Sequence, residues 1–446
     1  MAYSAHFTCF AGCDERYPLD AVVYRCRRCG SLLDVQHDLD ALRATPADDW
    51  KARFATRWRG ATEADASGVW SKREWVYPGI DPDSVVSFGE GYSPLVHARR
   101  YGRSLGLEHL YVKPCGNGHT GSFKDLGMTV LVSGVREMMR RGGTVRAVMC
   151  ASTGDTSAAL AAYCAAADIP SLVLLPRDKV SIAQLLQPLA HGSLVLSLDT
   201  DFDGCMKVVQ ALADDPSLYL ANSMNSLRIE GQKTVAFEIA QQMGWDVPEW
   251  VVIPGGNLGN VYALGKGFAL LRDLGLTSRV PRLCVAQAAQ ANPLMRAFRT
   301  GFARYEPVAA QRTAASAIQI GDPVSIHRAV RVLQACDGVV EEATEHELAD
   351  AVARADRTGL YNCPHTGVAL AATEKLAARG VIASGDRVVV VSTAHGLKFS
   401  EFKRAYHEGV LPGATSHAAN VPVQLAADVG AVRDAIARHL DARAGG

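Results

Sequence analysis

From Tyr111 onward, apolar runs alternate with segments typical of helices. Residues 144–152 (TVRAVMCAS) form one such run, and after the polar turn STGDTS the chain continues with the alanine-rich segment AALAAYCAAA, which predicts a helix. The same order recurs at SLVLLPRD, EWVVIPGGNLGN, RLCVAQA and DRVVVVSTAHG. Buried strands that alternate with helices predict parallel sheets with helices on both faces. Two separated groups of these units predict two α/β domains with a cleft between them.

Three further segments add to this pattern. Within GVVEEATEHELADAVARADRTG we expect a strand and then a helix with its N-cap at Thr344. Residues 38–87 are polar, carry four tryptophans and show no clear periodicity, so we expect an extension that packs on the main body or on a partner subunit. Near the C-terminus, four apolar residues share one helical face and predict a packed terminal helix. They are Val429, Val432, Ile436 and Leu440.

Composition argues against two classes of partner. The 446 residues include 46 Lys+Arg and 46 Asp+Glu, so the formal net charge is zero, which argues against nucleic acid or a membrane surface as the main partner. No apolar run reaches the roughly 18–20 residues of a membrane span. The first residues, MAYSAHFTCF, have neither the charged and apolar regions of a signal peptide nor the Arg/Ser-rich character of a transit peptide. We therefore expect a cytoplasmic enzyme.

The cysteines fall into two groups. Seven of the 11 are scattered through apolar or glycine-rich contexts, which predicts buried reduced thiols. The other four, Cys9, Cys13, Cys26 and Cys29, form two close pairs, and the second pair lies in the turn CRRCG. Such pairs are typical of a structural zinc site, or of iron in a rubredoxin-like site. Residues 1–37 are thus predicted to form a zinc-ribbon-like knuckle. The alternative is a small turn with incidental cysteines.

Two turns between strand and helix have the composition of anion-binding sites. In PGGNLGN (254–260), glycines allow backbone N–H groups to converge on an anion at a helix N-terminus. This loop lacks the Lys-Ser/Thr of a Walker sequence and the spacing GxGxxG, so it predicts a phosphate cradle without the residues for a nucleoside triphosphate. A simple glycine turn is the alternative. STGDTSAA (152–159) is a second turn of this kind, rich in hydroxyl groups.

One lysine stands where a third loop becomes a helix. In GNGHTGSFKDLGM (116–128), Lys124 follows small polar residues and precedes an acid and an apolar run. Alone, it could be a surface charge, a phosphate-binding cation or a nucleophile. An amine, a phosphate cradle and a second anion pocket in one α/β cleft fit pyridoxal 5′-phosphate, with Lys124 forming the Schiff base and the glycine loop holding the 5′-phosphate.

Several of these motifs resemble those of threonine synthases, pyridoxal-phosphate enzymes of the tryptophan-synthase-β fold type (fold type II). The resemblance runs from about Gly68 to Lys398, and GVWSKREWV (68–76) is similar to the plant-type branch. It is carried by GEGYSPL, HTGSFKDLG, CASTGDTSAAL, NSMNSLRIEGQKT, PGGNLGN, SAIQIGDPVS and STAHGLKF. It implies a large cofactor-binding domain (88–122 and 223–446) and a small domain (123–222).

The resemblance also implies roles for individual residues. Lys124 matches the Schiff-base lysine, which would also move protons on the substrate. Other cofactor contacts would come from Asp155, Gly256, Asn257, Leu258, Gly259, Asn260 and Thr393. Thr393 would meet the pyridine nitrogen, and Asp155 would face the 3′-oxygen, where many relatives carry asparagine and an acid favours a protonated partner. Substrate contacts would come from Ser152, Thr153 and Thr156 for the carboxylate and from Asn222, Ser223 and Arg228 for the phosphate.

The implied reaction converts O-phospho-L-homoserine and water to L-threonine and phosphate by γ-elimination and β-hydration, the last step of threonine biosynthesis. A homodimer and an S-adenosylmethionine effector are implied as partners. One rival is a cysteate-synthase-like β-replacement on phosphoserine, and another is a non-catalytic zinc-ribbon protein with a degenerate enzyme body. We assign no role to His119, His365 and His395. Of the three, His365 is the best candidate for a functional role.

Overall fold

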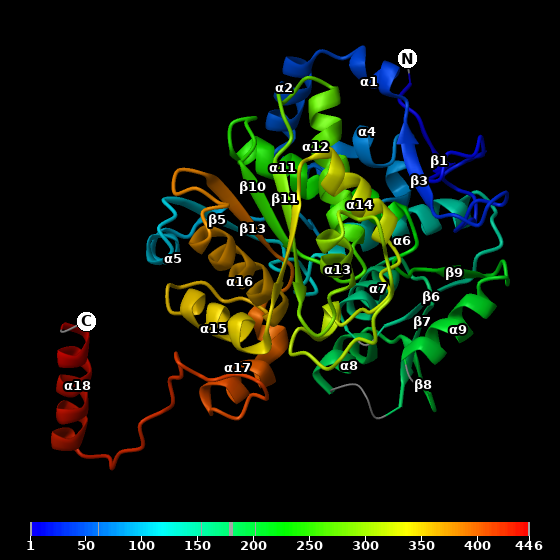
Figure 1. Cartoon of the computed structure of the whole chain (residues 1–446). Helices are drawn as coiled ribbons and strands as arrows, with labels where there is room; N and C mark the ends of the chain where they lie inside the picture. The colour runs from blue at the N-terminus through cyan, green and yellow to red at the C-terminus, as the bar shows by residue number, and fades with distance from the viewer. Residues whose placement is uncertain (1, 61, 153, 178–181, 201, 445–446) are drawn as a thin grey trace.

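The computed structural model describes residues 2–60, 62–152, 154–177, 182–200 and 202–444. The chain forms two mainly parallel sheets covered by helices, and one small antiparallel sheet at the N-terminus (Figure 1). The predicted α/β class with two parallel sheets is therefore confirmed. None of the helices in the described ranges has both the length and the apolar character needed to cross a membrane.

The N-terminal sheet has the order β2-β1-β3 and is antiparallel throughout. Its strands are β1 (Ala5–Cys9), β2 (Arg16–Tyr17) and β3 (Leu33–His37). Phe7, Leu33 and Val35 are buried in the core cluster that continues into the main body. The sheet is therefore packed on the larger part of the protein, and the end of β1 and the following turns carry the four clustered cysteines.

The extension forms short helices that pack on the main body. Trp50, Trp70 and Trp75 are wholly buried. The Trp75 ring meets Phe237 edge to face, with ring centroids 5.1 Å apart. This is one of the two arrangements expected from the sequence. The elements are α1 (Leu39–Arg43), α2 (Ala47–Arg57), α3 (Glu63–Ala66), η1 (Trp70–Lys72), α4 (Arg73–Val76) and η2 (Pro82–Ser84).

The larger sheet has six strands in the order β12-β11-β10-β13-β5-β4, of which only β4 runs antiparallel to its neighbour. The strands are nearly all apolar because helices cover both faces: Val251 and Ile253 belong to one core cluster, and Val252 belongs to the other. They are β4 (Val96–His97), β5 (His109–Pro114), β10 (Trp250–Pro254), β11 (Arg282–Ala288), β12 (Val339–Ala343) and β13 (Arg387–Ser392).

Helices on the two faces of this sheet come from different parts of the chain, with α11, α12 and α14 on one face and α15 and α16 on the other (Figure 1). Thr344 caps α15 in a capping box with Glu347, as predicted. The elements are α5 (Arg99–Ser104), α10 (Leu227–Gln232), α11 (Thr234–Gln242), α12 (Gly259–Asp273), α13 (Pro293–Arg299), η3 (Ser316–Ile318), α14 (Ile326–Ala335), α15 (Glu345–Asp356), α16 (Pro364–Ala378), η4 (Gly396–Phe399) and α17 (Ser400–His407).

The smaller sheet is parallel, with the order β8-β7-β6-β9. Val148 and Cys150 of β6 face one core cluster, and Met149 and Ala151 face another, so this sheet is also covered on both sides. Its elements are α6 (Lys124–Arg140), β6 (Ala147–Ala151), α7 (Asp155–Ala166), β7 (Ser171–Pro176), α8 (Ile182–Ala190), β8 (Leu194–Leu198), α9 (Phe202–Leu212) and β9 (Leu218–Leu220).

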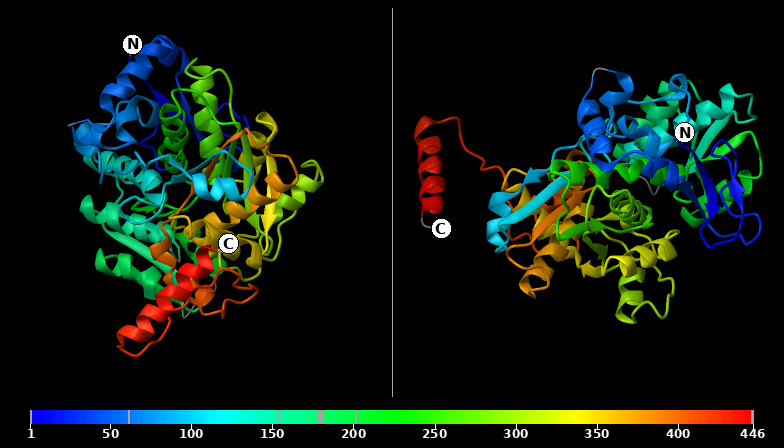
Figure 2. Two further views of the ribbon diagram at one scale, coloured as in Figure 1. Left: turned by 90° about the vertical axis from the view of Figure 1, so that its left-hand side faces the viewer. Right: turned by 90° about the horizontal axis from the view of Figure 1, so that it is seen from above.

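The predicted C-terminal helix exists as α18 (Val429–Ala444), but the prediction that it packs on the body is wrong. Val429, Val432, Ile436 and Leu440 are 74, 42, 54 and 59% exposed. Figures 1 and 2 show α18 standing away from the body at the end of an irregular segment. A helical period shows which face of a helix is apolar, and it contains no information about what covers that face.

Candidate active site

A cavity of about 430 Å³ is lined by residues that follow strands of both parallel sheets. Ser152 follows β6, Pro254 ends β10 and Thr393 follows β13. In α/β proteins, ligands bind at this carboxyl edge of the strands. The predicted site residues that line the cavity are Lys124, Ser152, Asp155, Thr156, Asn222, Ser223, Arg228, Gly256, Asn257, Leu258, Gly259, Asn260 and Thr393. Thr153 lies outside the described residues.

Lys124 is the first residue of α6, and the loop before it is held against the end of β13. The Phe123 N–H donates to the Thr393 carbonyl at 2.9 Å, and the His395 N–H donates to the Gly121 carbonyl at 2.9 Å. Ser122 and Ala394 form an antiparallel bridge between these two hydrogen bonds. Lys124 is thereby fixed at the boundary between the two sheets, where it lines the cavity.

The environment of Lys124 favours its uncharged form. Burial, and to a smaller extent the Arg228 guanidinium and Lys398, lower the pKa of its amine to about 7, although Asp155 opposes this shift. An uncharged amine is the form that attacks a carbonyl group. Of the three roles considered for this lysine, a nucleophile therefore fits best, because a surface charge or a phosphate-binding cation would be fully protonated near neutral pH.

Close contact between α6 and α10 brings Lys124 and Arg228 to the same cavity. A Cβ atom at Gly231 of α10 would lie 1.7 Å from the Leu126 carbonyl oxygen of α6. A Cβ atom at Gly127 would lie 3.0 Å from the Arg228 carbonyl oxygen. Glycine at these two positions thus lets the helices approach closely, and a larger residue at Gly231 would push them apart.

The glycine loop between β10 and α12 forms an anion cradle. Leu258 lies in the left-handed region with φ 64°, and Asn260 ties the loop back by donating from Nδ2 to the Pro254 carbonyl at 2.9 Å. A Cβ atom at Gly256 would meet the Ile318 Cα at 2.9 Å, so the loop and η3 are in close contact. The backbone N–H groups of residues 256–260 have no acceptor within the described ranges, and they begin a helix, where an anion is favoured.

The second predicted turn begins α7. Ser152 Oγ accepts from the N–H groups of Gly154 and Ser157, both at 3.3 Å, which shapes the turn before the helix. The Asp155 carboxylate accepts from Lys398 Nζ at 2.8 Å. Burial opposes ionisation of Asp155, but the charge and the hydrogen bond of Lys398 outweigh it, with smaller contributions from His365 and Lys124, and the pKa of Asp155 is lowered. Asp155 is therefore a carboxylate in the cavity wall.

Arg228 is the buried guanidinium of the cavity. It donates to the Ala221 carbonyl at 2.9 Å and to Thr156 Oγ1 at 3.4 Å, and its Nε has no partner in the described part of the chain. Burial lowers its pKa to about 10, so it stays charged at neutral pH. A buried charge without a carboxylate partner is costly, and an anionic ligand would compensate it.

Asn222 and Ser223, the predicted residues that accompany Arg228, differ in whether their side chains already make hydrogen bonds. Asn222 uses both ends of its amide on β6: Nδ2 donates to the Ala151 carbonyl at 2.8 Å, and Oδ1 accepts from the Ala151 N–H at 3.1 Å. Ser223 lines the cavity next to it. Asn222 thus fixes the turn that leads into α10, and Ser223 is the residue of the two with an uncommitted side chain.

Of the three histidines without an assigned role, only His365 lines the cavity. Its Nε2 accepts from the Ala317 N–H at 3.0 Å and so holds η3, to which Ala317 belongs. His119 stacks on Phe88, with ring centroids 4.0 Å apart, and His395 caps η4 by accepting from the Leu397 N–H. These contacts support structural functions for all three.

The sequence analysis missed several polar residues of the cavity, and two of them contact each other. Lys398 and Gln187 line it, and Lys398 Nζ is 3.4 Å from Gln187 Oε1. Lys398 stands in the quoted motif STAHGLKF, so a signal was available. Gln187 lies in α8, where no motif marks it.

The cavity fits pyridoxal 5′-phosphate by the chemistry of its donor groups. It combines an amine that is partly uncharged at neutral pH, a loop with unpaired N–H groups at a helix N-terminus and the buried hydroxyl of Thr393. These are the partners required by the aldehyde, the phosphate and an unprotonated ring nitrogen. Arg228 belongs to α10 and not to the glycine loop, so it is available to bind a second anion.

The four clustered cysteines converge on one point. Their Sγ atoms lie within 4.8 Å of one another. All four are free thiols, and those of Cys9 and Cys29 are 3.4 Å apart. Four sulfur ligands from two turns suit a tetrahedral metal ion with no open coordination position, so the donor set is that of a structural site.

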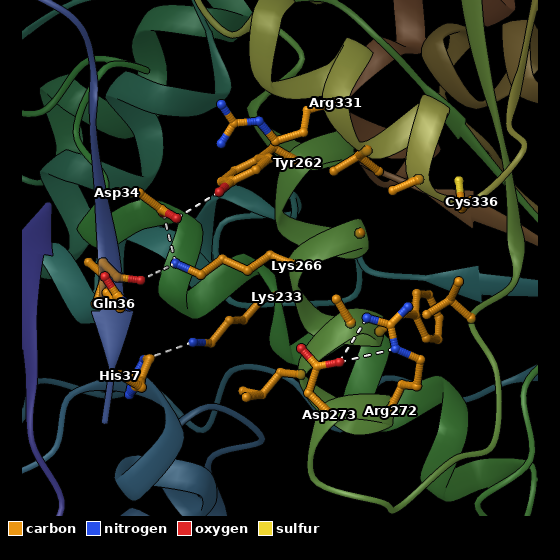
Figure 3. A pocket seen from close by; sticks show the side chains of 18 of the residues that line it. Asp34, Gln36, His37, Lys233, Tyr262, Lys266, Arg272, Asp273, Arg331 and Cys336 are labelled. Carbon is orange, nitrogen blue, oxygen red and sulfur yellow. Dashed lines mark hydrogen bonds and ion pairs between the residues drawn. The ribbon is translucent and has the colours of Figure 1, made fainter. Parts of the chain in front are cut away.

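A second cavity, of about 370 Å³, lies between β3 and the helices α12 and α14 (Figure 3). Asp34 of β3 accepts from Tyr262 Oη at 2.6 Å and from Lys266 Nζ at 2.8 Å. Lys266 also donates to Glu230 of α10 at 2.7 Å. None of the predicted site residues lines this cavity. This cavity lies where the N-terminal sheet contacts α10 and α12, two helices that also line the candidate active site. We call this contact the joint.

That joint contains a buried group of charges. Glu230 accepts from His37 Nε2 and Lys266 Nζ, both at 2.7 Å, and also pairs with Lys233. Burial raises the pKa of Glu230, but Lys233 and Lys266 outweigh it, so the pKa is held far below its usual range. Burial and Lys233 lower the pKa of His37 to about 4, so this histidine is neutral. Two lysines, two carboxylates and a neutral histidine leave the joint close to charge balance.

Comparison with known proteins identifies relatives over most of the chain. A family model described as pyridoxal-phosphate dependent enzyme matches residues 86–394. Threonine synthase 2, chloroplastic, of Arabidopsis thaliana is 55% identical over 428 residues, which cover 96% of this chain and 83% of that protein. Threonine synthase of Methanocaldococcus jannaschii is 36% identical over 387 residues, 86% of this chain and 91% of that protein.

Solved structures agree with the fold. The structure of threonine synthase from Brucella melitensis with bound pyridoxal phosphate matches with a TM-score of 0.67 and 20% identity, covering 95% of this chain and 93% of that chain. Threonine synthase from Escherichia coli matches with a TM-score of 0.65 and 20% identity, covering 97% and 100%. At this level of identity the structural matches bear on the fold alone.

Proposed function

The chain belongs to the family of pyridoxal-phosphate-dependent enzymes, and we infer that it is a threonine synthase, a lyase that converts O-phospho-L-homoserine and water to L-threonine and phosphate. The observation that carries this inference is the combination of two separate anion sites with one reactive amine in a single cavity. The glycine loop at residues 256–260 suits the cofactor phosphate, and Arg228 on α10 suits the phosphate of the substrate.

Lys124 holds the cofactor in this proposal and then moves protons. When bound, the cofactor supplies the electron sink for carbanions on the substrate. The Lys124 amine, with its pKa near 7, is suited both to accept a proton from the substrate carbon atoms and to return one. Lys124 lines the same cavity as the proposed partners of the substrate carboxylate and phosphate, so a substrate held at both ends would present Cα, Cβ and Cγ to this amine.

The substrate is held at two ends. Its carboxylate binds the turn that begins α7, with Ser152, Thr153 and Thr156 as partners. Its phosphate binds Arg228, with Ser223 beside it and Asn222 fixing the turn. Arg228 and Thr156 are already in contact at 3.4 Å, so the two subsites adjoin. A guanidinium suits a phosphate because it offers several donors in one plane and keeps its charge.

Two residues complete the cofactor contacts. Thr393 offers a hydroxyl, not a carboxylate, to the pyridine nitrogen, which leaves the ring less protonated and a weaker electron sink. Asp155 would face the 3′-oxygen and favour a protonated partner at that oxygen or at the imine. Gly256, Asn257, Leu258, Gly259 and Asn260 hold the 5′-phosphate through their N–H groups.

One assay tests the proposed function against its nearest rival. Release of phosphate and of threonine from O-phospho-L-homoserine is measured beside release of phosphate from phosphoserine with sulfite. We expect turnover of phosphohomoserine and none of phosphoserine. Turnover of phosphoserine with sulfite and no threonine would instead assign a cysteate-synthase-like replacement. Absence of a visible absorbance band with added pyridoxal phosphate would favour a non-catalytic protein.

We also propose a structural zinc ion at Cys9, Cys13, Cys26 and Cys29, in a knuckle of residues 1–37. The convergence of four thiols supports it. None of the 11 cysteines forms a disulfide in the described residues, which is typical of a reducing compartment, and we propose the cytoplasm. The domain division is proposed to follow the two sheets, with residues 88–122 and 223–446 in the large domain and 123–222 in the small one.

Two partners are proposed from the likeness to plant-type enzymes. The protein would act as a homodimer, which sedimentation velocity would test. S-adenosylmethionine would bind as an effector, and the test is its effect on kinetics and on thermal stability at millimolar concentration. If neither changes, this protein has no such effector. Neither partner is required by the reaction proposed for the cavity.

A further inference from the structure

Lys398 connects the two walls of the active-site cavity. It lies on η4, directly after β13 of the larger sheet. Its Nζ contacts Asp155 Oδ1 at 2.8 Å and donates to the Thr120 carbonyl at 3.0 Å, and Gln187 Oε1 lies 3.4 Å away. Asp155 begins α7 and Gln187 belongs to α8, both of which pack around the smaller sheet. One ammonium group therefore has partners on both sides of the cavity.

The stem of Lys398 is held in place by packing. Gly121 has a φ of +80°, and a Cβ atom there would come within 2.9 Å of the Lys398 Cδ. The lysine side chain thus lies directly on the backbone of the loop that leads to Lys124. Because the stem is confined and the ammonium has three oxygen partners, the position of this charge is well determined, unlike that of a surface lysine.

Asp155 has two lysines within electrostatic reach, and only one of them forms an ion pair with it. The charged and titratable groups that act on Asp155 are Lys398, His365 and Lys124. Those that act on Lys124 are Arg228, Asp155 and Lys398. Lys398 attracts Asp155 and repels a proton on Lys124, so both of its effects favour an ionised Asp155 beside an uncharged Lys124. Without Lys398, the groups left to attract the Asp155 carboxylate would be His365 and the protonated form of Lys124.

We propose that Lys398 is a positioning residue of the active site: its ammonium neutralises Asp155, joins the two walls of the cavity and leaves Lys124 free as the reactive amine. This extends the proposed function, because it explains how a carboxylate can stand in the cofactor site without capturing the lysine that must react. Lys398 itself need not touch the substrate. Its effect is transmitted through Asp155.

The test follows the charge of Lys124 in four variants. Lys398→Met keeps the length of the side chain and removes the charge, and Lys398→Arg keeps the charge. Asp155→Asn removes the opposite charge, and the double variant removes both. In cofactor-free protein, the rate at which Lys124 reacts with an acylating reagent is measured against pH by mass spectrometry of its peptide. In the loaded protein, the pH midpoint of the visible absorbance band is measured.

The expected shifts differ in sign. Lys398→Met removes repulsion from Lys124 and frees the attraction of Asp155, so the midpoint of Lys124 reactivity rises by about 1 pH unit or more. Asp155→Asn lowers the midpoint, the double variant returns it close to the wild-type value, and Lys398→Arg leaves it there. The absorbance midpoint should move in the same order. If Lys398→Met does not fold, the opposite shift in Asp155→Asn and the unchanged value in Lys398→Arg still test the proposal.

Lys375→Met serves as the matched control. Lys375 is a partly buried lysine of α16 that pairs with Glu341 and Glu347 and does not line the cavity. A loss of general stability would appear equally in Lys375→Met and in Lys398→Met, whereas the shift in Lys124 reactivity should appear only in the latter. Equal midpoints in the wild type, Lys398→Met and Asp155→Asn would overturn the proposal. Because these measurements use no substrate, a failure to turn over phosphohomoserine would refute the proposed function and leave them unaffected.

Discussion

Arg228 and Glu230 lie two positions apart on α10, and their side chains reach different parts of the protein. The Arg228 guanidinium lines the active-site cavity, while the Glu230 carboxylate accepts from His37 of the N-terminal sheet at 2.7 Å. Ser226, at the start of the same helix, donates to the Leu33 carbonyl of β3. The N-terminal sheet therefore braces the helix that presents the buried guanidinium, so the knuckle contributes to the site without lining it.

Replacing Lys124 tests the identity of the reactive amine. Lys124→Ala should reduce turnover to background and remove the visible absorbance of the bound cofactor, because Lys398, the other lysine that lines the cavity, is engaged with Asp155. Lys51→Ala, at a partly exposed lysine of α2 that does not line the cavity, should retain full activity. Activity well above a trace in Lys124→Ala, with no amine added to the buffer, would refute the assignment.

Arg228→Ala should damage handling of the phosphorylated substrate selectively. Loss of one partner from a buried charge pair costs about 2–5 kcal/mol, so kcat/KM should fall by roughly 30-fold to several-thousand-fold. Cofactor absorbance and binding of small unphosphorylated amino acids should change little, since the cofactor phosphate has its own loop. The control is Arg331→Ala, an exposed arginine on α14. Loss of cofactor in Arg228→Ala would mean that the residue is structural.

The double variant Cys26→Ser/Cys29→Ser should lose bound metal and become less stable while retaining the cofactor spectrum. A structural metal contributes to folding and touches no substrate. A loss of 1 kcal/mol lowers the melting temperature of a chain of 446 residues by about 1 °C. Metal analysis and thermal unfolding measure both effects, with Cys336→Ser as the control thiol outside the cluster. One equivalent of metal in the double variant would place the metal elsewhere.

Acid should destabilise the joint between the N-terminal sheet and α10. The folded-state pKa of His37, about 4, lies below its ordinary value of 6.5, so the unfolded chain binds the proton more readily. This contribution to stability is complete above pH 6.5 and is lost as the pH falls towards 4, at about 1.4 kcal/mol for each pKa unit. Urea unfolding between pH 8 and pH 4.5 should therefore fall more steeply for the wild type than for His37→Gln. Parallel curves would show that His37 does not carry this dependence.

Residues that function within short contiguous motifs could be predicted from the sequence. Lys124, the loop at residues 256–260 and the turn that begins α7 each combine a backbone conformation with the side chain or N–H groups that use it. Thr344 and Glu347 form a capping box because the two residues are three positions apart, which a sequence shows directly. In each case the chemistry and the geometry are encoded within a few residues.

Contacts between distant segments could not be predicted in this way. The Lys398–Asp155 pair and the His37–Glu230 hydrogen bond depend on how α7, α10 and β3 pack, and no local pattern announces them. The extension shows no clear periodicity in the sequence, because its helices other than α2 are too short to display a period. Its burial comes from aromatic contacts such as that between Trp75 and Phe237. In α18 the opposite holds: the sequence shows a clear apolar face, but no part of the described chain covers it.

The position of the tryptophans gives the protein an optical asymmetry. All six lie at positions 50, 58, 70, 75, 245 and 250, outside residues 123–222. Intrinsic tryptophan emission therefore reports mainly on the extension and the larger sheet. Trp70 lies where the extension contacts α6, because its indole N–H donates to Thr129 Oγ1 of α6 at 2.7 Å. A movement of α6 on substrate binding would thus change the emission of a residue that lies outside the cavity.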